Sequence, residues 1–194
     1  MVLEALENIR VVLGSQSPRR KELLARLGVD FQVLVLETEE FVDRRLSPAE
    51  VVVDIAQKKS EKFASEEFFD SLVITADTVV VHRNILLGKP KDSADAFQTL
   101  KSMQGEKHSV YTAVALRFQQ KTYTFMEETI VELYPLSDQE IHYYINKFEP
   151  YDKAGSYGIQ EWIGLIGIKS IEGSYENVVG LPTARLYQEI KSIL

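Results

Sequence analysis

Apolar and polar residues alternate along this chain with two different periods. Short apolar runs bounded by turn residues are typical of strands, and they occur over residues 9–14, 31–36, 72–81 and 165–171. Apolar positions three and four residues apart predict helices, over residues 18–28, 48–63, 93–103 and 138–147 and after Pro182. Ser47 and Ser137 each begin a Ser-x-x-Glu capping pattern, which marks the start of two of these helices.

One stretch breaks the alternation of strand and helix. Residues 109–118 and 123–133 both have strand character and flank the turn residues Gln119-Gln120-Lys121, so we expect an antiparallel pair. Elsewhere the order of elements favours parallel neighbours, so the sequence predicts an α/β fold with a mixed sheet. The length fits a single domain over residues 1–194, or two tightly packed lobes.

Composition narrows the class of protein. The chain is 45% hydrophobic and 26% charged, as in ordinary globular proteins. It has no cysteine, which excludes disulfides, a thiol nucleophile and zinc–thiolate sites. The net charge of −7 argues against a nucleic-acid polymer as partner, but not against a single nucleotide. We expect no signal peptide, no membrane anchor and a cytoplasmic location; the sequence leaves open whether the chain forms a homodimer.

The first candidate site is the segment 14–21, with the sequence GSQSPRRK. It leads from a strand into a capped helix, whose first turn carries free N–H groups and the positive end of the helix dipole. Arg19, Arg20 and Lys21 lie where that dipole disfavours cations by about 0.3–1 kcal/mol each. An anion that binds there, beside Ser15, would offset this cost. A solvated basic helix start is the alternative.

The second candidate is Asp77, which lies with Thr78 in an otherwise apolar strand. A carboxylate in such a strand is costly unless it has a partner or a function. Asp77 suits metal binding or general-base catalysis. The alternative is a strand-end aspartate bonded to a neighbouring turn.

Further charged groups surround these two segments in the sequence. Lys59 follows Lys58 on a predicted helix, and Lys89 follows a short strand; lysine suits phosphate oxygens. An acidic cluster at residues 37, 39 and 40 ends in Glu40 and suits Mg²⁺ or Mn²⁺. Taken singly, each is more typical of a solvated surface.

The third candidate is the segment 153–160, with the sequence KAGSYGIQ, which starts at Lys153. Its glycines allow a ligand to approach the backbone, and Gln160 can donate and accept at a base edge. A structural loop explains the glycines equally well. His108 is expected to be a packed histidine. Walker, GxSxG, HExxH and dinucleotide motifs are all absent from the sequence.

Together these segments resemble the Maf family of nucleoside-triphosphate pyrophosphatases. The resemblance is carried by five motifs in order: SQSPRR at 15–20, ADT at 76–78, GKP at 88–90, KAGSYGIQ at 153–160 and GSYENVVGLP at 173–182. It implies a two-lobed α/β fold with a mixed, twisted sheet and a nucleotide cleft, similar to inosine-triphosphate pyrophosphatases. It also implies cleavage between the α- and β-phosphates with Mg²⁺ or Mn²⁺ as cofactor.

The resemblance assigns a role to each matching residue. The general base would be Asp77, which would share a metal ion with Glu40. The substrate-binding residues would be Ser15, Arg19, Arg20, Lys59, Thr78, Lys89, Lys153 and Gln160. Among these, the combination of Arg19, Thr78 and Gln160 resembles the dTTP/UTP branch of the family.

Three other functions remain open at this point. The 7-methyl-GTP branch of the same family is the nearest. A nucleotide-binding regulator of cell division would belong to another class, since the family is linked to inhibition of septum formation. A sugar-nucleotide transferase would also have glycine-rich turns and basic residues, although it usually needs a longer chain to hold its acceptor.

Overall fold

The computed structural model describes residues 2–38, 43 and 45–194 of the chain. Its strands are β1 (Arg10–Leu13), β2 (Gln32–Val33), β3 (Ser71–His82), β4 (Ile85–Leu87), β5 (Lys107–Phe118), β6 (Lys121–Leu133) and β7 (Ile168–Glu172). Its α-helices are α1 (Val2–Leu6), α2 (Pro18–Arg26), α3 (Pro48–Glu61), α4 (Ser93–Met103), α5 (Asp138–Phe148), α6 (Trp162–Gly167), α7 (Tyr175–Val179) and α8 (Thr183–Ile193). Short 3₁₀ turns are η1 (Glu66–Phe68), η2 (Pro150–Asp152) and η3 (Ala154–Ser156).

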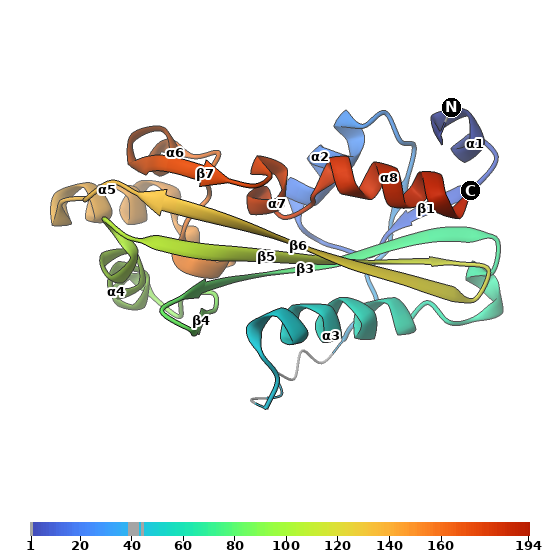
Figure 1. Ribbon diagram of the computed structural model, residues 1–194, viewed down its shortest axis with the longest axis horizontal. Coiled ribbons are helices and arrows are strands. Elements are labelled where there is room, and N and C mark those ends of the chain that lie inside the picture. The colour runs from blue at the N-terminus through green and yellow to red at the C-terminus, as the bar shows by residue number, and fades with distance from the viewer. Residues whose placement is uncertain (1, 39–42, 44) are drawn as a thin grey trace. The chain divides into compact units, whose positions relative to one another are not determined.

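The strands form one mixed sheet, as the sequence predicts. Its order is β2-β1-β3-β5-β6-β7, with β4 paired to β3. Strand β1 runs parallel to β2 and β3, whereas β4 and β7 run antiparallel to β3 and β6. Only Gln119 and Gln120 separate β5 from β6, and both have positive φ, 47° and 63°. These angles suit the tight turn of an antiparallel hairpin, which is visible in Figure 1.

The chain divides into two compact units. Unit 1 contains Met1–Asp77, Thr112–Glu127 and Gly180–Leu194, and unit 2 contains Thr78–Tyr111 and Glu128–Val179. Strands β3, β5 and β6 each contribute residues to both units. The division in β3 falls directly after Asp77, the predicted general base.

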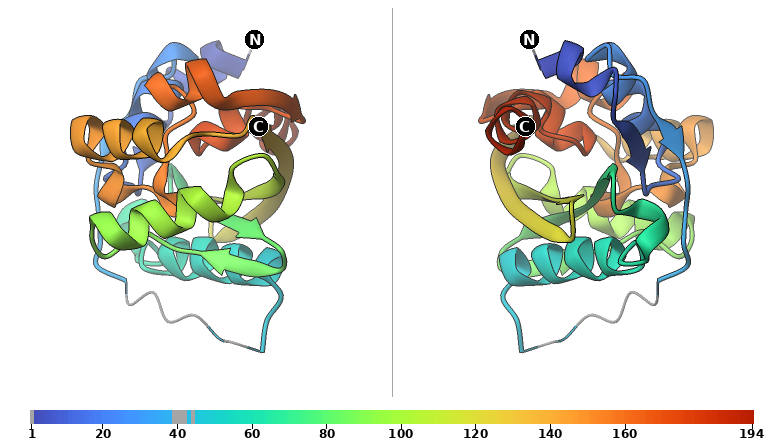
Figure 2. Two further views of the ribbon diagram at one scale, coloured as in Figure 1. Left: turned by 90° about the vertical axis from the view of Figure 1, so that its left-hand side faces the viewer. Right: turned by 90° about the vertical axis from the view of Figure 1, so that its right-hand side faces the viewer.

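Unit 1 is built around the first half of β3. The residues from Ser71 to Ala76 are all buried, as expected of a strand that is covered on both faces. Helix α3 lies on one face of the sheet and α8 on the other (Figures 1 and 2). Just after α3, Phe63 and Phe68 pack edge to face, with ring centroids 5.1 Å apart. Both rings pack against Val12 and Val73.

Unit 2 has its own apolar core. Helices α4 and α5 contact each other. They bury Leu100, Met103, Ile141, Tyr144 and Ile145. The same cluster includes Val110 and Val131 of the sheet, with Tyr157, Ile159 and Ile163 from the C-terminal half.

Helix α7 is fastened to this core by one buried amide. The Nδ2 group of Asn177 donates to the carbonyl oxygen of Val110 at 3.0 Å and to Oγ1 of Thr129 at 2.9 Å. Thr129 in turn donates to the carbonyl oxygen of Ser174. The segment 173–182 therefore contains a structural anchor, which lies in α7.

Most predicted elements are confirmed, and the serine caps are confirmed in detail. Ser17, Ser47 and Ser137 each accept from the backbone N–H three residues later, and the latter two complete capping boxes. The predicted strand over 31–36 is reduced to Gln32–Val33, and α1 and α7 were not predicted.

One strand prediction is wrong in its first half. Residues 162–167 form α6, and strand structure begins only at Ile168. The run WIGLIG is too short and too uniformly apolar for its period to separate helix from strand. Among the described residues, no helix has both the length and the apolar character needed to span a bilayer.

The anchor of α7 gives a stability prediction. Asn177→Ala removes the donor to two buried acceptors, so the free energy of unfolding should fall by about 1–3 kcal/mol. Urea unfolding measures this change. The matched control is Asn146→Ala, at an exposed position of α5, which should change it little. Equal effects of the two substitutions would contradict the role of Asn177.

Candidate active site

The first predicted site begins where β1 turns into α2. The backbone N–H of Gly14 donates to the carbonyl oxygen of Ile74 at 2.9 Å. A Cβ at Gly14 would lie 2.8 Å from Cγ2 of Thr75 and 3.0 Å from Phe63, so only glycine fits. This close approach brings the start of α2 to the strand that carries Asp77.

Arg20 links this turn to the other end of the chain. Its Nη1 donates to Oγ of Ser15 at 3.2 Å, and its Nε donates to the carbonyl oxygen of Gly180 at 2.8 Å. Two motifs that are 160 residues apart in sequence are thereby joined. Ser15 is buried, whereas Arg19 and Arg20 are half-buried.

Asp77 is held on β3 by the helix that covers it. Oγ1 of Thr75 donates to the carbonyl oxygen of Ala56 at 2.8 Å, and two residues further on Nζ of Lys59 donates to Oδ1 of Asp77 at 2.8 Å. Residues two apart on a strand share a face, as residues three apart do on a helix. Both pairs therefore join the same face of β3 to the same face of α3.

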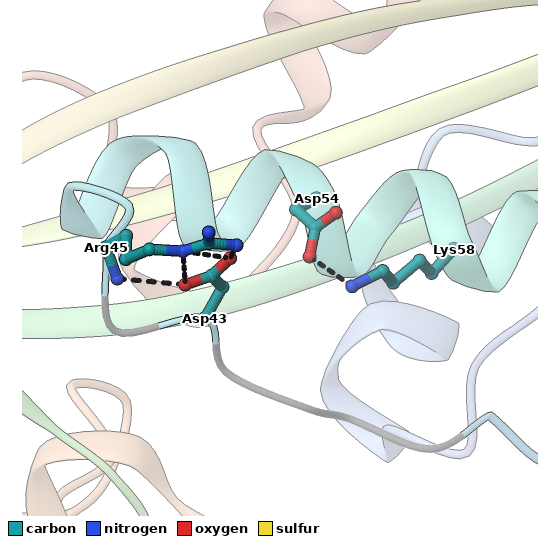
Figure 3. A network of polar contacts seen from close by, with 4 residues as sticks. All are labelled: Asp43, Arg45, Asp54 and Lys58. Carbon is teal, nitrogen blue, oxygen red and sulfur yellow. Dashed lines mark hydrogen bonds and ion pairs between the residues drawn. The ribbon is translucent and has the colours of Figure 1, made fainter.

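The neighbouring lysine has a different position. Nζ of Lys58 lies 2.6 Å from Oδ2 of Asp54, one turn earlier on the same helix (Figure 3). Arg45 pairs with Asp43 close to the start of α3. Lys58 thus forms an ordinary surface ion pair within its helix. Lys59, the next residue, contacts Asp77 instead.

The second group of predicted residues lies in unit 2, where two motifs meet through the backbone. The N–H of Gly155 donates to the carbonyl oxygen of Gly88 at 3.2 Å. Gly155 has φ +70°, and a Cβ there would lie 3.0 Å from Val80, so glycine is required twice over. Lys89, next to Gly88 in the chain, is exposed.

Lys153 is buried in a charged network that the sequence analysis did not predict. Its Nζ lies 2.7 Å from Oδ1 of Asp152 and 3.1 Å from Oε1 of Glu161. The hydroxyl of Tyr144 donates to Oε2 of Glu161 and accepts from the N–H of Gly158 at 3.0 Å. Burial, followed by the hydrogen bond to Glu161, raises the pKa of Tyr144, so this hydroxyl keeps its proton. Gln160, directly before Glu161, is exposed.

The same loop packs against a buried histidine. Nε2 of His108 lies 2.7 Å from the hydroxyl of Tyr157, and His108 is only 3% exposed. Burial, followed by the nearby His82, lowers its pKa from 6.5 to about 4. The packed histidine that the sequence predicts is confirmed.

A pocket of about 440 Å³ lies in unit 1, between Leu46, the first half of α3 and Met126. Of the predicted site residues that the structure describes, none lines it. Its walls are mostly apolar, and its two carboxylates already have partners: Glu50 in the capping box and Asp54 with Lys58. The lining residues that the structure describes therefore include no cation for a triphosphate.

The family of the chain follows from comparison with known proteins. The family described as Maf-like protein matches residues 10–193. The chain belongs to the Maf family.

Relatives within the Maf family match over nearly their whole length. A dTTP/UTP pyrophosphatase from Phocaeicola vulgatus is 45% identical over 193 residues, covering 99% of this chain and 100% of the relative. One from Flavobacterium psychrophilum is 44% identical over 187 residues, covering 96% of each. The solved structure of the Staphylococcus aureus Ham1 protein aligns with a TM-score of 0.46 and 17% identity, over 93% of this chain and 99% of that one. The α/β fold of this chain is shown by its own strand order and by its family.

The described residues of this Maf-family chain include one of the two predicted metal ligands, Asp77. Across the described ranges, no three His, Cys, Asp or Glu side chains gather as a metal site. Asp77 supplies one hard oxygen donor; Glu40, the other predicted ligand, lies outside the described residues. A carboxylate such as that of Asp77 suits Mg²⁺, which proteins commonly bind through one or two carboxylates together with the phosphates of a substrate.

The predicted residues are shared between the two units. Those in unit 1 are Ser15, Arg19, Arg20, Lys59 and Asp77, and those in unit 2 are Thr78, Lys89, Lys153 and Gln160. Three residues of the network around Lys153 were not predicted: Asp152, Glu161 and Tyr144. Asp152 and Glu161 flank the KAGSYGIQ motif, and this position next to the motif is the signal that could have indicated them.

The buried histidine of this Maf-family chain gives a pH prediction. Because the pKa of His108 is lower in the folded state than in the unfolded chain, the unfolded chain binds more protons between about pH 6.5 and pH 4. The stability that neutral His108 contributes should therefore be lost as pH falls through that window, by about 1 kcal/mol per pH unit.

The measurement is the free energy of unfolding at several pH values for the parent and for His108→Gln. The difference between the two should change across the window. His142→Gln, at an exposed position, is the control and should leave the slope unaltered. A parent and a His108→Gln variant with parallel pH profiles would contradict the prediction.

Proposed function

We propose that this chain hydrolyses dTTP and UTP to the monophosphate and pyrophosphate. Family membership supports the proposal, together with relatives of that name at 44–45% identity. The observation that carries it is the ion pair of Asp77 and Lys59, 2.8 Å apart and each less than one-fifth exposed. A carboxylate and an ammonium group thus lie together at the point where β3 leaves unit 1.

Asp77 is the general base in this proposal. Lys59 engages Oδ1, which fixes the carboxylate and directs Oδ2 as the oxygen that accepts a proton from water. The water then attacks the α-phosphorus in line with the leaving pyrophosphate. Because the bond from Lys59 already restricts the Asp77 carboxylate, the side chain loses little conformational entropy when it reacts. Such positioning is a main source of rate enhancement.

Cations of the chain stabilise the charge on the phosphate oxygens. Lys59 holds its ammonium beside Asp77 and is the first phosphate ligand in the proposal. Arg20 is oriented by Ser15 and Gly180, and it is the second phosphate ligand in the proposal. Lys89 is exposed and is the third phosphate ligand in the proposal.

A divalent cation, Mg²⁺ or Mn²⁺, supplies charge neutralisation and orientation of the triphosphate when bound. Asp77 and Glu40 are its proposed protein ligands.

Two further features stay predictions: the arrangement of two lobes around one nucleotide cleft, and the cytoplasmic location.

In the proposal, Arg19, Thr78 and Gln160 select the nucleobase of the substrate. A pyrimidine presents an acceptor beside a donor at its O4/N3 edge, and a glutamine amide complements both. Gln160 is exposed at the end of its loop, as a residue that meets a ligand must be. Polar groups that are left unpaired by a wrong base make such a site selective.

The activity is tested with a panel of nucleoside triphosphates, assayed for pyrophosphate release with Mg²⁺, with Mn²⁺ and with a chelator. We expect dTTP and UTP to give the highest kcat/KM, and the chelator to abolish turnover. Preference for 7-methyl-GTP would assign the chain to the other branch. Release of orthophosphate in place of pyrophosphate would refute cleavage between the α- and β-phosphates.

Asp77→Asn tests the proposed base directly. The amide keeps the shape of the side chain but cannot accept the proton, so kcat should fall about 10²–10⁴-fold. Circular dichroism and thermal unfolding verify that the variant is folded. Asp70→Asn, at an exposed position just before β3, is the control and should retain parental turnover. A folded Asp77→Asn protein with near-parental turnover would remove Asp77 from the mechanism.

A further inference from the structure

Glu161 occupies the centre of the buried network around the 153–161 loop. One carboxylate oxygen faces Nζ of Lys153 at 3.1 Å, and the other accepts from the hydroxyl of Tyr144. The Glu161 side chain is 19% exposed and that of Lys153 is 9% exposed. Both ends of the loop are thus tied to one carboxylate, at its start by Lys153 and near its end through Tyr144.

The loop also packs closely against this carboxylate. A Cβ added to Gly158 would lie 2.8 Å from Cδ of Glu161 and 3.0 Å from Nε2 of Gln160. The backbone N–H of Gly158 donates to the hydroxyl of Tyr144 at 3.0 Å. Gly158, Gln160 and Glu161 therefore fix one another's positions, and the Gln160 amide rests on a backbone that Glu161 and Tyr144 hold.

We propose that Glu161 is a positioning residue for substrate choice: with Tyr144 and Lys153 it holds the loop so that Gln160 presents its amide to the nucleobase. This inference rests on the proposed function. It assigns Lys153 mainly to the same network, because its ammonium already lies between two carboxylates, those of Asp152 and Glu161.

The charge of Glu161 is central to this role. A buried ammonium is costly without an opposite charge, and Asp152 is half exposed, so solvent weakens that pair. Replacing Glu161 by glutamine would keep the size of the side chain and a hydrogen-bond acceptor for Tyr144, but would remove the charge that holds Lys153. The loop would then lose its tie at residue 153 and retain part of the tie at Gly158.

The kinetic test compares Glu161→Gln and Tyr144→Phe with the parent on dTTP, UTP and 7-methyl-GTP. Misplacing the Gln160 amide should raise KM for dTTP and UTP about 10–100-fold, with a smaller change in kcat. The ratio of kcat/KM between the pyrimidine substrates and 7-methyl-GTP should fall. Glu161→Asp, which keeps the charge, should recover part of that ratio.

A second readout is independent of activity. Hydrogen exchange of the Gly158 amide should quicken about tenfold in Tyr144→Phe, the equivalent of one ordinary hydrogen bond. Glu172→Gln and Tyr143→Phe, both at exposed positions of unit 2, are the matched controls. Neither should change the exchange rate or the substrate ratio.

The outcomes separate the inference from the proposed function. Equal loss for all three substrates would mean a purely structural role for Glu161 and would overturn the inference, as would unchanged ratios and unchanged exchange. A parent protein that releases no pyrophosphate would overturn the proposed function, and the role in base choice with it. In that case the exchange of Gly158 would still decide whether Tyr144 holds the loop.

Discussion

The ion pair between Lys59 and Asp77 is the constraint on which the arrangement of unit 1 depends. Asp77 follows six buried residues on β3, and a carboxylate at such a position needs a partner. Helix α3 provides it only when the face that carries Ala56 and Lys59 is turned toward the strand. The bond from Thr75 to the carbonyl oxygen of Ala56 fixes the same orientation one step earlier. The same contacts therefore determine how α3 packs and where Asp77, the proposed general base, lies.

This requirement extends to the start of the chain. Strand β1 runs parallel to β3 with Leu13 beside Ile74, and Gly14 then lies so close to Thr75 and Phe63 that no side chain fits. The chain leaves β1 at this glycine, and Ser17 caps the helix that follows. The phosphate-binding residues proposed for α2 are placed by backbone packing, and Arg20 reinforces this through Gly180.

In unit 2, different interactions order the segment that contains Lys153 and Gln160. The 153–161 loop has little regular structure, and its order comes from a charged network and two tightly packed glycines. A carboxylate between an ammonium and a hydroxyl fixes direction more narrowly than apolar contact does, because hydrogen bonds weaken steeply with angle. Such a network is costly to leave half satisfied, so loss of one member should affect the whole loop.

The sequence by itself determined the local features of this protein. Serine caps, apolar spacing and turn residues predict most helices and strands because each depends on neighbours within a few residues, and the five motifs in order indicate the Maf family. Where the local signal was weak, as in the short run WIGLIG, the sequence did not separate helix from strand. Only the tertiary structure decided that Lys59, not Lys58, meets Asp77, and that Lys153 is enclosed by Asp152 and Glu161. Those pairings depend on which face of a helix or loop packs against the sheet, and that choice is made by the whole core and not by adjacent residues.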